Sequence, residues 1–134
     1  GTANGTFFGQ TCDDGDGCDC SAFVCWSLMM RKGPALSLWS RWWGTDQIEH
    51  DANGDKRWFR AILEPVPLSI FVYGAGGAIG HTGWVMSVDA GEPLTIIDCS
   101  SSQSRKLGDA IRRRPGDWLT QRKDVTYCVP AWWD

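Results

Sequence analysis

The stretch GCDCSAFVCWSL, residues 17–28, places Cys20 where an acidic, glycine-rich segment becomes a run of apolar residues. Asp19 is a good helix N-cap, and Gly33 followed by Pro34 is a stop signal, so we expect a helix over residues 20–32. Apolar residues lie nearly all round this helix, which predicts a central, buried position. Three explanations compete for the cysteine in its first turn: a disulfide, a metal ligand or a nucleophile.

A nucleophile suits this position chemically. A cysteine in the first turn of a helix faces unpaired backbone N–H groups and the positive end of the helix dipole, and both stabilise the reactive thiolate. The six cysteines lie at positions 12, 18, 20, 25, 99 and 128. If Cys20 is reserved for chemistry, at least one other cysteine stays unpaired, so a complete disulfide framework conflicts with catalysis.

The other cysteines have simpler interpretations. Cys12 and Cys18 would close a small loop in an oxidising compartment, whereas Cys25 and Cys128 suit small buried hydrophobic positions. A zinc site built from the first four cysteines would have irregular spacing and would extend into an apolar helix. We therefore expect no metal and no cofactor.

Length and composition predict one compact domain over residues 1–134. The net charge of −3 argues against nucleic acid as a partner. No apolar run reaches membrane-spanning length and no signal peptide is visible, so we expect no membrane insertion, and we expect a monomer. The basic cluster Arg112, Arg113 and Arg114 is either a solvated face or the source of an arginine that meets a substrate carboxylate. The nine tryptophans mainly fill the core, and stacking of one or two on sugar or peptide stays open.

The order of the expected elements predicts the fold class. Strand patterns occupy residues 68–73, 82–88, 94–98 and 125–129, and residues 89–93 form a turn that joins the second and third strands in a hairpin. Residues 110–113 fit a short strand, with a helix as the alternative, and residues 35–66 look irregular. Because no helical crossover separates the strands, we expect an α+β domain with an antiparallel sheet.

A glycine-rich segment supplies the second candidate residue. In GAGGAIGHTGWVMSV, residues 74–88, a flexible loop leads through His81 into a strand. A phosphate-binding glycine loop would open a helix, so a nucleotide site is rejected. Gly83 lies on the same strand face as His81 and leaves space beside the imidazole. His50 stands among acidic and amide residues and is expected in a surface loop.

Asp98, at the end of the strand LTIID, is the candidate that would orient the imidazole. In an antiparallel pair, His81 and Asp98 point to the same face only if the residue numbers of paired positions add to an odd number. A direct pairing of the two residues would also put Val85 opposite Leu94.

In this order, these residues resemble the NlpC/P60 family of cysteine peptidases, which cut the peptide stems of bacterial peptidoglycan. The chain has DCSAFV at 19–24, GHTGWV at 80–85 and IIDCSSSQ at 96–103, in the places of three family motifs. The resemblance extends over most of the chain and is to compact forms found in phage lysins and related bacterial proteins. It implies a papain-like fold in which the helix bearing the cysteine packs on the antiparallel sheet.

The resemblance implies that Cys20 is the nucleophile, His81 the general base and Asp98 the orienting residue. Asp98 stands where the family often has histidine, and Ala22 replaces a glycine of the first motif. The segment TFFGQ, residues 6–10, lacks the tyrosine that many members use in the oxyanion hole.

Other groups would then have to bind the oxyanion and the substrate. The backbone N–H of Cys20 would serve, with help from Thr6 or Gln10. Ser21, Gly80 and Gly83 are expected to line the same site.

The implied activity is hydrolysis of amide bonds in the peptide stems of peptidoglycan, with the bond between D-glutamate and diaminopimelate as the usual target of the family. The alternatives are an N-acetylmuramoyl-L-alanine amidase, a wall-binding module that has lost catalysis, and a disulfide-stapled structural protein. The enzyme would act in the periplasm or cell wall after phage lysis or secretion.

Overall fold

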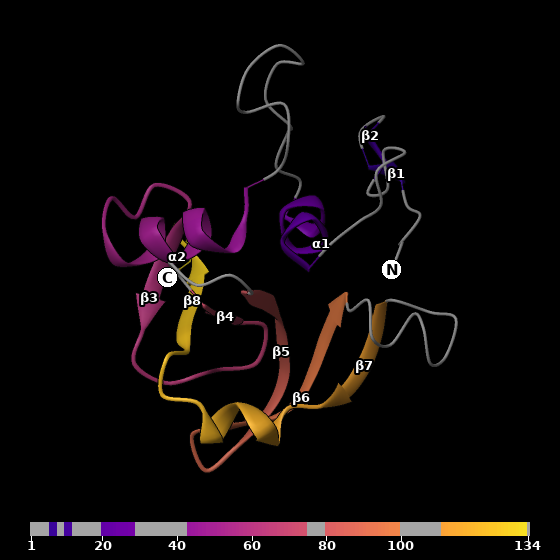
Figure 1. Cartoon of the computed structure of the whole chain (residues 1–134), viewed down its shortest axis with the longest axis vertical. Helices are drawn as coiled ribbons and strands as arrows, with labels where there is room; N and C mark the ends of the chain where they lie inside the picture. The colour runs from indigo at the N-terminus through magenta and orange to yellow at the C-terminus, as the bar shows by residue number, and fades with distance from the viewer. Residues whose placement is uncertain are drawn as a thin grey trace. The chain divides into compact units, whose positions relative to one another are not determined.

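The computed structural model describes residues 6–7, 10–11, 20–28, 43–74, 80–99 and 111–133 of the 134-residue chain. Backbone contacts divide the chain into two compact units. One unit comprises Gly1–Gly44 with Asp98–Arg112, and the other comprises Thr45–Ile97 with Arg113–Asp134. The helices and strands of both units are labelled in Figure 1.

The first unit contains helix α1, Cys20–Ser27, and a two-stranded sheet. The helix begins at Cys20, as predicted. Its apolar residues Phe23, Val24 and Cys25 are buried, which agrees with the expected central position. In the small sheet, β1, Thr6–Phe7, pairs antiparallel with β2, Gln10–Thr11.

Helix α1 is shorter than the sequence predicts. It ends at Ser27, and Leu28 already lies in a turn, although a helix was expected up to residue 32. The hydroxyl of Ser27 donates a 2.8 Å hydrogen bond to the carbonyl of Val24, a local bond that competes with continuation of the helix. The expected stop signal at residues 33–34 lies outside the described residues.

A six-stranded sheet follows in the order β3-β8-β4-β5-β6-β7. The described pairings from β3 through β6 are all antiparallel, so the predicted α+β class with an antiparallel sheet is confirmed (Figure 1). The strands are β3, Phe59–Ile62; β4, Ile70–Tyr73; β5, His81–Asp89; β6, Glu92–Cys99; β7, Ile111–Pro115; and β8, Thr126–Pro130.

The predicted strands are confirmed with small shifts at their ends. The turn between β5 and β6 is a tight hairpin in which Ala90 and Gly91 both have positive φ, 51° and 78°, as a two-residue turn between right-twisted strands requires. Strand β4 begins later than expected, because Leu68 has a φ of 67°, which is incompatible with an extended strand. Residues 111–115 form β7, so the helical alternative for that segment is wrong.

The expectation that residues 35–66 are irregular is wrong for two segments. Helix α2 occupies Thr45–Asn53, and β3 occupies Phe59–Ile62. The buried residues of α2 are Ile48, Asp51 and Ala52, which recur at the helical spacing. His50 is exposed as predicted, but it lies on this helix rather than in a loop.

Asp51 connects α2 to β3. Its carboxylate accepts backbone N–H bonds from Arg57 at 3.1 Å and from Trp58 and Phe59 at 2.9 Å each. These three donors lie where the chain enters β3, so one buried carboxylate satisfies the backbone at the start of that strand.

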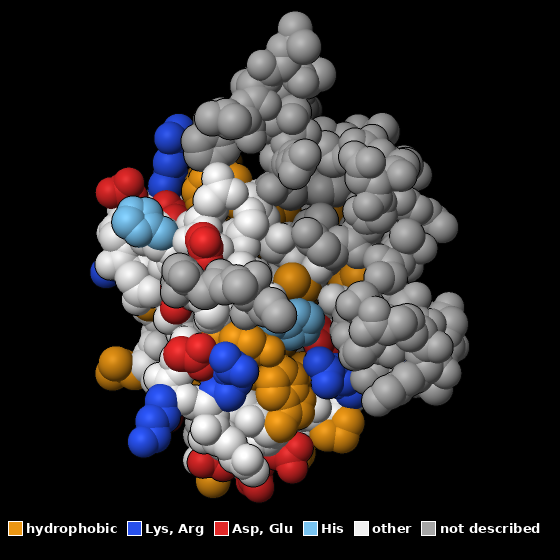
Figure 2. All heavy atoms as spheres, in the orientation of Figure 1, with side chains coloured by type: hydrophobic (Ala, Val, Ile, Leu, Met, Phe, Trp, Pro, Cys, Tyr) orange, Lys and Arg blue, Asp and Glu red, His pale blue; other side chains and the backbone are white. Residues whose placement is uncertain are grey.

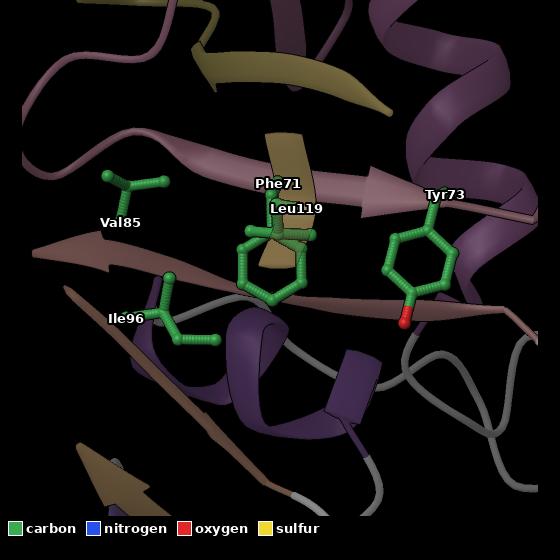
Figure 3. Close-up of a cluster of buried hydrophobic side chains, with 5 residues drawn as sticks. All are labelled: Phe71, Tyr73, Val85, Ile96 and Leu119. Carbon is green, nitrogen blue, oxygen red and sulfur yellow. The ribbon is translucent and has the colours of Figure 1, made fainter. Parts of the chain in front are cut away.

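One cluster of buried side chains in the second unit lies on the face of the sheet that concerns His81. It consists of Phe71 and Tyr73 from β4, Val85 from β5, Ile96 from β6, and Leu119 from a 3₁₀ turn at Asp117–Gln121 (Figure 3). Since residues two apart on a strand share a face, this cluster identifies the face of β5 to which His81 belongs.

Candidate active site

Cys20 is the first residue of α1 and is half-buried. Its thiol is free, so the structure does not lock the sulfur in a disulfide. Ser21, Phe23, Val24 and Cys25, which follow it in the helix, are buried, so the backbone that carries the sulfur is well packed. Cys20 therefore presents a half-buried, unbridged sulfur at the first turn of a helix.

His81 is the first residue of β5, as the sequence predicts, and is half-buried. It lies directly opposite Tyr73 on β4. The imidazole centroid is 6.0 Å from the ring of Tyr73 and 5.8 Å from the ring of Phe71, with both pairs tilted. Two aromatic side chains of the core therefore hold the imidazole in place.

Asp98 is fully buried on β6. In the β5–β6 register, Trp84 lies opposite Ile97 and Val85 opposite Ile96, so the numbers of paired residues add to an odd number. The register shifts of this pair lie beyond Val85, away from the His81 end of the strand. This is the parity that a His81–Asp98 pair needs.

The direct pairing of His81 with Asp98 is wrong. It would place Val85 opposite Leu94, whereas the structure places Val85 opposite Ile96, a slip of two residues. A slip of two residues preserves the face of every side chain, because the side-chain period of a strand is two.

The two candidate glycines next to His81 differ in their surroundings. A Cβ atom on Gly80 would meet the side chain of Thr45 and would lie 2.9 Å from the carbonyl oxygen of Tyr73. Gly83 is buried and lies opposite Phe71 on β4. At Gly80 the absence of a side chain is thus required by close packing of the backbone.

The remaining site candidates belong to the first unit. Ser21 is the second residue of α1 and is buried. Thr6 lies on β1 opposite Thr11, and Gln10 lies on β2. The side chains of Thr6 and Gln10 lie outside what the structure describes.

An aromatic and basic surface lies beside His81; the sequence analysis singled out Arg114 in it but missed Trp118 and Arg122. The indole of Trp118 meets the rings of Phe71 and Tyr73 edge-on, each at 6.2 Å between centroids. The guanidinium carbon of Arg122 lies 3.7 Å from the centroid of the Tyr73 ring, and that of Arg114 lies 5.0 Å from the Trp118 ring. Local periodicity cannot reveal these contacts, because they join β4 to segments far along the chain.

The other described cysteines are structural. Cys25 and Cys128 are fully buried, as predicted. The thiol of Cys25 makes a 3.8 Å contact with the carbonyl oxygen of Trp43. Burial raises the pKa of the Cys128 thiol to about 12, with further contributions from the charges of Asp51 and Glu49.

Over residues 20–28, 43–74, 80–99 and 111–133, no three His, Cys, Asp or Glu side chains are grouped as a metal would require. Cys12 and Cys18, which the zinc and small-loop interpretations need, lie outside the described residues. No helix in the described part of the chain has the length and apolar character needed to cross a membrane.

Comparison with known proteins identifies a domain type. The family model described as CHAP domain matches residues 11–100, more than half of the chain. This segment contains Cys20, His81 and Asp98. No curated protein matches the chain.

Proposed function

The chain belongs to the CHAP domain family, which comprises cysteine- and histidine-dependent amidohydrolases that act on peptidoglycan, and from this premise we propose that Cys20, His81 and Asp98 form its catalytic triad. The CHAP family is related to the NlpC/P60 peptidases that the sequence resembles. Both families comprise cysteine enzymes that act on peptidoglycan, so the expected class of enzyme is confirmed although the matching family model is CHAP. The protein is therefore an enzyme of the bacterial cell wall.

The position of Cys20 is the main observation in support of the proposed catalytic triad. A free thiol on the first residue of a buried helix, inside the matched segment, has the environment that a cysteine nucleophile needs. The parity of the β5–β6 pairing supports the other two members, since it directs His81 and Asp98 to one face of their strands.

The reaction follows from these roles. His81 accepts the thiol proton of Cys20 while the sulfur forms a bond to the carbonyl carbon of the scissile amide. When the tetrahedral intermediate collapses, the carbon–nitrogen bond breaks, and the imidazolium returns its proton to the leaving amine. Water, deprotonated by His81, then attacks the thioester and releases the acid and the thiol. Asp98 accepts the second N–H of the imidazole and fixes its tautomer.

The oxyanion needs hydrogen-bond donors at the start of α1. The backbone N–H of Cys20 supplies one, and Thr6 or Gln10 a second. Ser21, Gly80 and Gly83 line the approach of the substrate. In this proposal the chain acts as one catalytic domain and as a monomer.

The substrate is the peptide stem of peptidoglycan, cut between D-glutamate and diaminopimelate. Hydrolysis of the amide between N-acetylmuramic acid and L-alanine is the alternative outcome. The enzyme reaches the wall by secretion or after phage lysis.

The test is digestion of purified peptidoglycan. Wild-type protein should solubilise the wall, and Cys20→Ala should abolish this activity without changing the thermal unfolding midpoint. Mass spectrometry of the released fragments identifies the bond, because cleavage of the stem leaves a free amine on diaminopimelate. A Cys20→Ala variant as active as wild type would overturn the proposed triad.

The chain offers a matched control for the histidine. His81→Gln should abolish activity, whereas His50→Gln should leave it unchanged, because His50 is exposed on α2. Equal loss in both variants would contradict the assignment of His81.

A further inference from the structure

Arg122 is held in one orientation beside the core. Its Nε and Nη2 atoms each donate a 2.9 Å hydrogen bond to a different carboxylate oxygen of Asp124. The guanidinium also stacks on Tyr73, with its central carbon 3.7 Å from the ring centroid. A bidentate ion pair and an aromatic stack together orient a planar group far better than a single contact does.

The segment that carries Arg122 is anchored in the core. Arg122 follows the 3₁₀ turn, and its backbone N–H donates a 3.1 Å hydrogen bond to the carbonyl of Leu119. The side chain of Leu119 is buried in the core cluster. The guanidinium is therefore presented from a fixed backbone rather than from a free surface loop.

Tyr73 links Arg122 to the proposed general base. The tyrosine ring is 3.7 Å from the guanidinium carbon on one side and 6.0 Å from the imidazole of His81 on another. The distance from the guanidinium to the imidazole cannot exceed the sum of these two lengths. Arg122 and His81 thus both adjoin the ring of Tyr73, close enough for one bound stem peptide to contact both.

One edge of the guanidinium remains for a ligand. A guanidinium has five N–H donors, and Asp124 engages only the edge formed by Nε and Nη2. Within the described residues, Nη1 makes no hydrogen bond, and the Arg122 side chain is 40% exposed. The edge between Nη1 and Nη2 matches a second carboxylate in the bidentate geometry that arginine favours.

A second arginine lies near the same aromatic side chains. Arg114 stacks on Trp118, which in turn meets Tyr73 edge-on. Figure 2 shows a histidine beside a group of hydrophobic side chains, with both basic and acidic side chains around that group. The charge of Arg114 therefore adds to that of the Arg122–Asp124 pair on this aromatic surface.

We infer that Arg122 binds a free carboxylate of the peptide stem and so positions the scissile amide at His81, an inference that rests on the proposed function. In a γ-linked D-glutamate, the side-chain carboxyl forms the amide and the α-carboxylate stays ionised a short carbon chain away. That α-carboxylate is the group that Arg122 would take. Arg122 is a specificity-determining residue, and Asp124 and Tyr73 position it.

The experiment compares two synthetic stem peptides that differ only in this group, one with the α-carboxylate and one with the α-carboxamide. Wild-type protein should prefer the carboxylate by roughly tenfold in kcat/KM, as one charge-assisted pair allows. Arg122→Gln should bring the ratio of the two substrates close to one. Lys123→Gln removes the same charge from the adjacent exposed residue and should keep the wild-type ratio.

The outcomes separate this inference from the proposed function. If wild type cleaves both peptides and Arg122→Gln lowers both rates equally, the inference is overturned and the enzyme assignment stands. Binding of both peptides to Cys20→Ala protein, measured by calorimetry, gives a readout that needs no catalysis. Weaker binding of the carboxylate peptide alone in Cys20→Ala/Arg122→Gln supports carboxylate recognition even if neither peptide is cleaved, and equal binding overturns it.

Discussion

Gly80 lies directly against Thr45, and a Cβ atom at Gly80 would overlap the threonine side chain. Thr45 is the first residue of α2, and Gly80 immediately precedes His81. The carbonyl oxygen of Tyr73, 2.9 Å from the same Cβ position, closes the other side. The start of α2 and the entrance of β5 are therefore fitted together with no space for a methyl group.

Gly80→Ala should destabilise the protein by about 1–3 kcal/mol, the usual cost of overpacking. The Thr45 side chain can rotate away, but the Tyr73 oxygen belongs to the backbone of β4 and cannot. The backbone at Gly80 then has to shift and displaces the neighbouring His81. The rate of peptidoglycan hydrolysis should therefore fall by more than the loss of folded protein accounts for. Urea unfolding and wall digestion at a temperature where both proteins are folded measure the two effects.

Gly54→Ala is the matched control. Within the described residues, a Cβ there would meet the carbonyl oxygen of His50, at 3.0 Å, and Gly54 lies in an exposed turn after α2. Its activity should equal that of wild type. Unchanged stability and activity in Gly80→Ala would show that this close packing does not constrain the site.

Asp51→Ala should destabilise the fold by about 3 kcal/mol, because it leaves three backbone N–H groups at the start of β3 without their acceptor. Asp51→Asn retains one oxygen and should cost about half as much. Urea denaturation measures both, and Asp55→Ala, on the exposed turn, should stay within about 0.5 kcal/mol of wild type. A loss in Asp51→Ala no larger than in Asp55→Ala would contradict the structural role of this carboxylate.

The fold was predictable where local signals agree with tertiary structure. The start of α1 was predicted from an N-cap residue type followed by apolar residues. The β5–β6 hairpin was predicted from a glycine-containing turn between two segments of alternating polarity. Helix α2 was missed because it is short and polar. One of its three buried residues is the acidic Asp51. Asp51 is buried because its carboxylate accepts a hydrogen bond from β3, and a hydrophobic periodicity cannot reveal such a bond.

The candidate site was predictable to a similar extent. Cys20 and His81 lie at the starts of their elements, as the motifs indicate. The sequence analysis left the β5–β6 register open, because alternation determines the face of a strand but not its pairing partner; the observed register differs by two residues from a direct His81–Asp98 pairing. The stacking of Arg122 on Tyr73 was invisible, since only the folded sheet brings the 3₁₀ turn to β4.

Cys20 and Cys128 should differ sharply in reactivity toward iodoacetamide at pH 8. Cys20 is half-buried at a helix start, whereas Cys128 is fully buried with its pKa raised to about 12, so its thiolate is scarce. Peptide mapping by mass spectrometry should find native protein modified at Cys20 and not at Cys128. Both should react in denaturant, and modification of native Cys128 as fast as Cys20 would refute this difference.

The pairing of Arg122 with Asp124 predicts a pH dependence. The hydrogen bonds from Arg122 lower the pKa of the Asp124 carboxyl below its ordinary value, and the nearby positive charge adds to this effect. Because the folded pKa is the lower one, the stabilisation is present above the unfolded pKa and is lost as pH falls through the folded pKa. Both side chains are exposed, so the contribution to unfolding free energy is small.

Carboxyl-carbon NMR should therefore place the Asp124 midpoint at more acid pH in wild type than in Arg122→Gln. Lys123→Gln removes a neighbouring charge but neither hydrogen bond, so it should shift the midpoint much less. Since the pair stays ionised from about pH 5 to pH 8, the preference for the carboxylate peptide should be constant over that range and should weaken only in acid. If the pH midpoint of the Asp124 titration is the same in Arg122→Gln and in wild type, the ion pair does not form in solution. Asp124 then does not hold Arg122 over Tyr73.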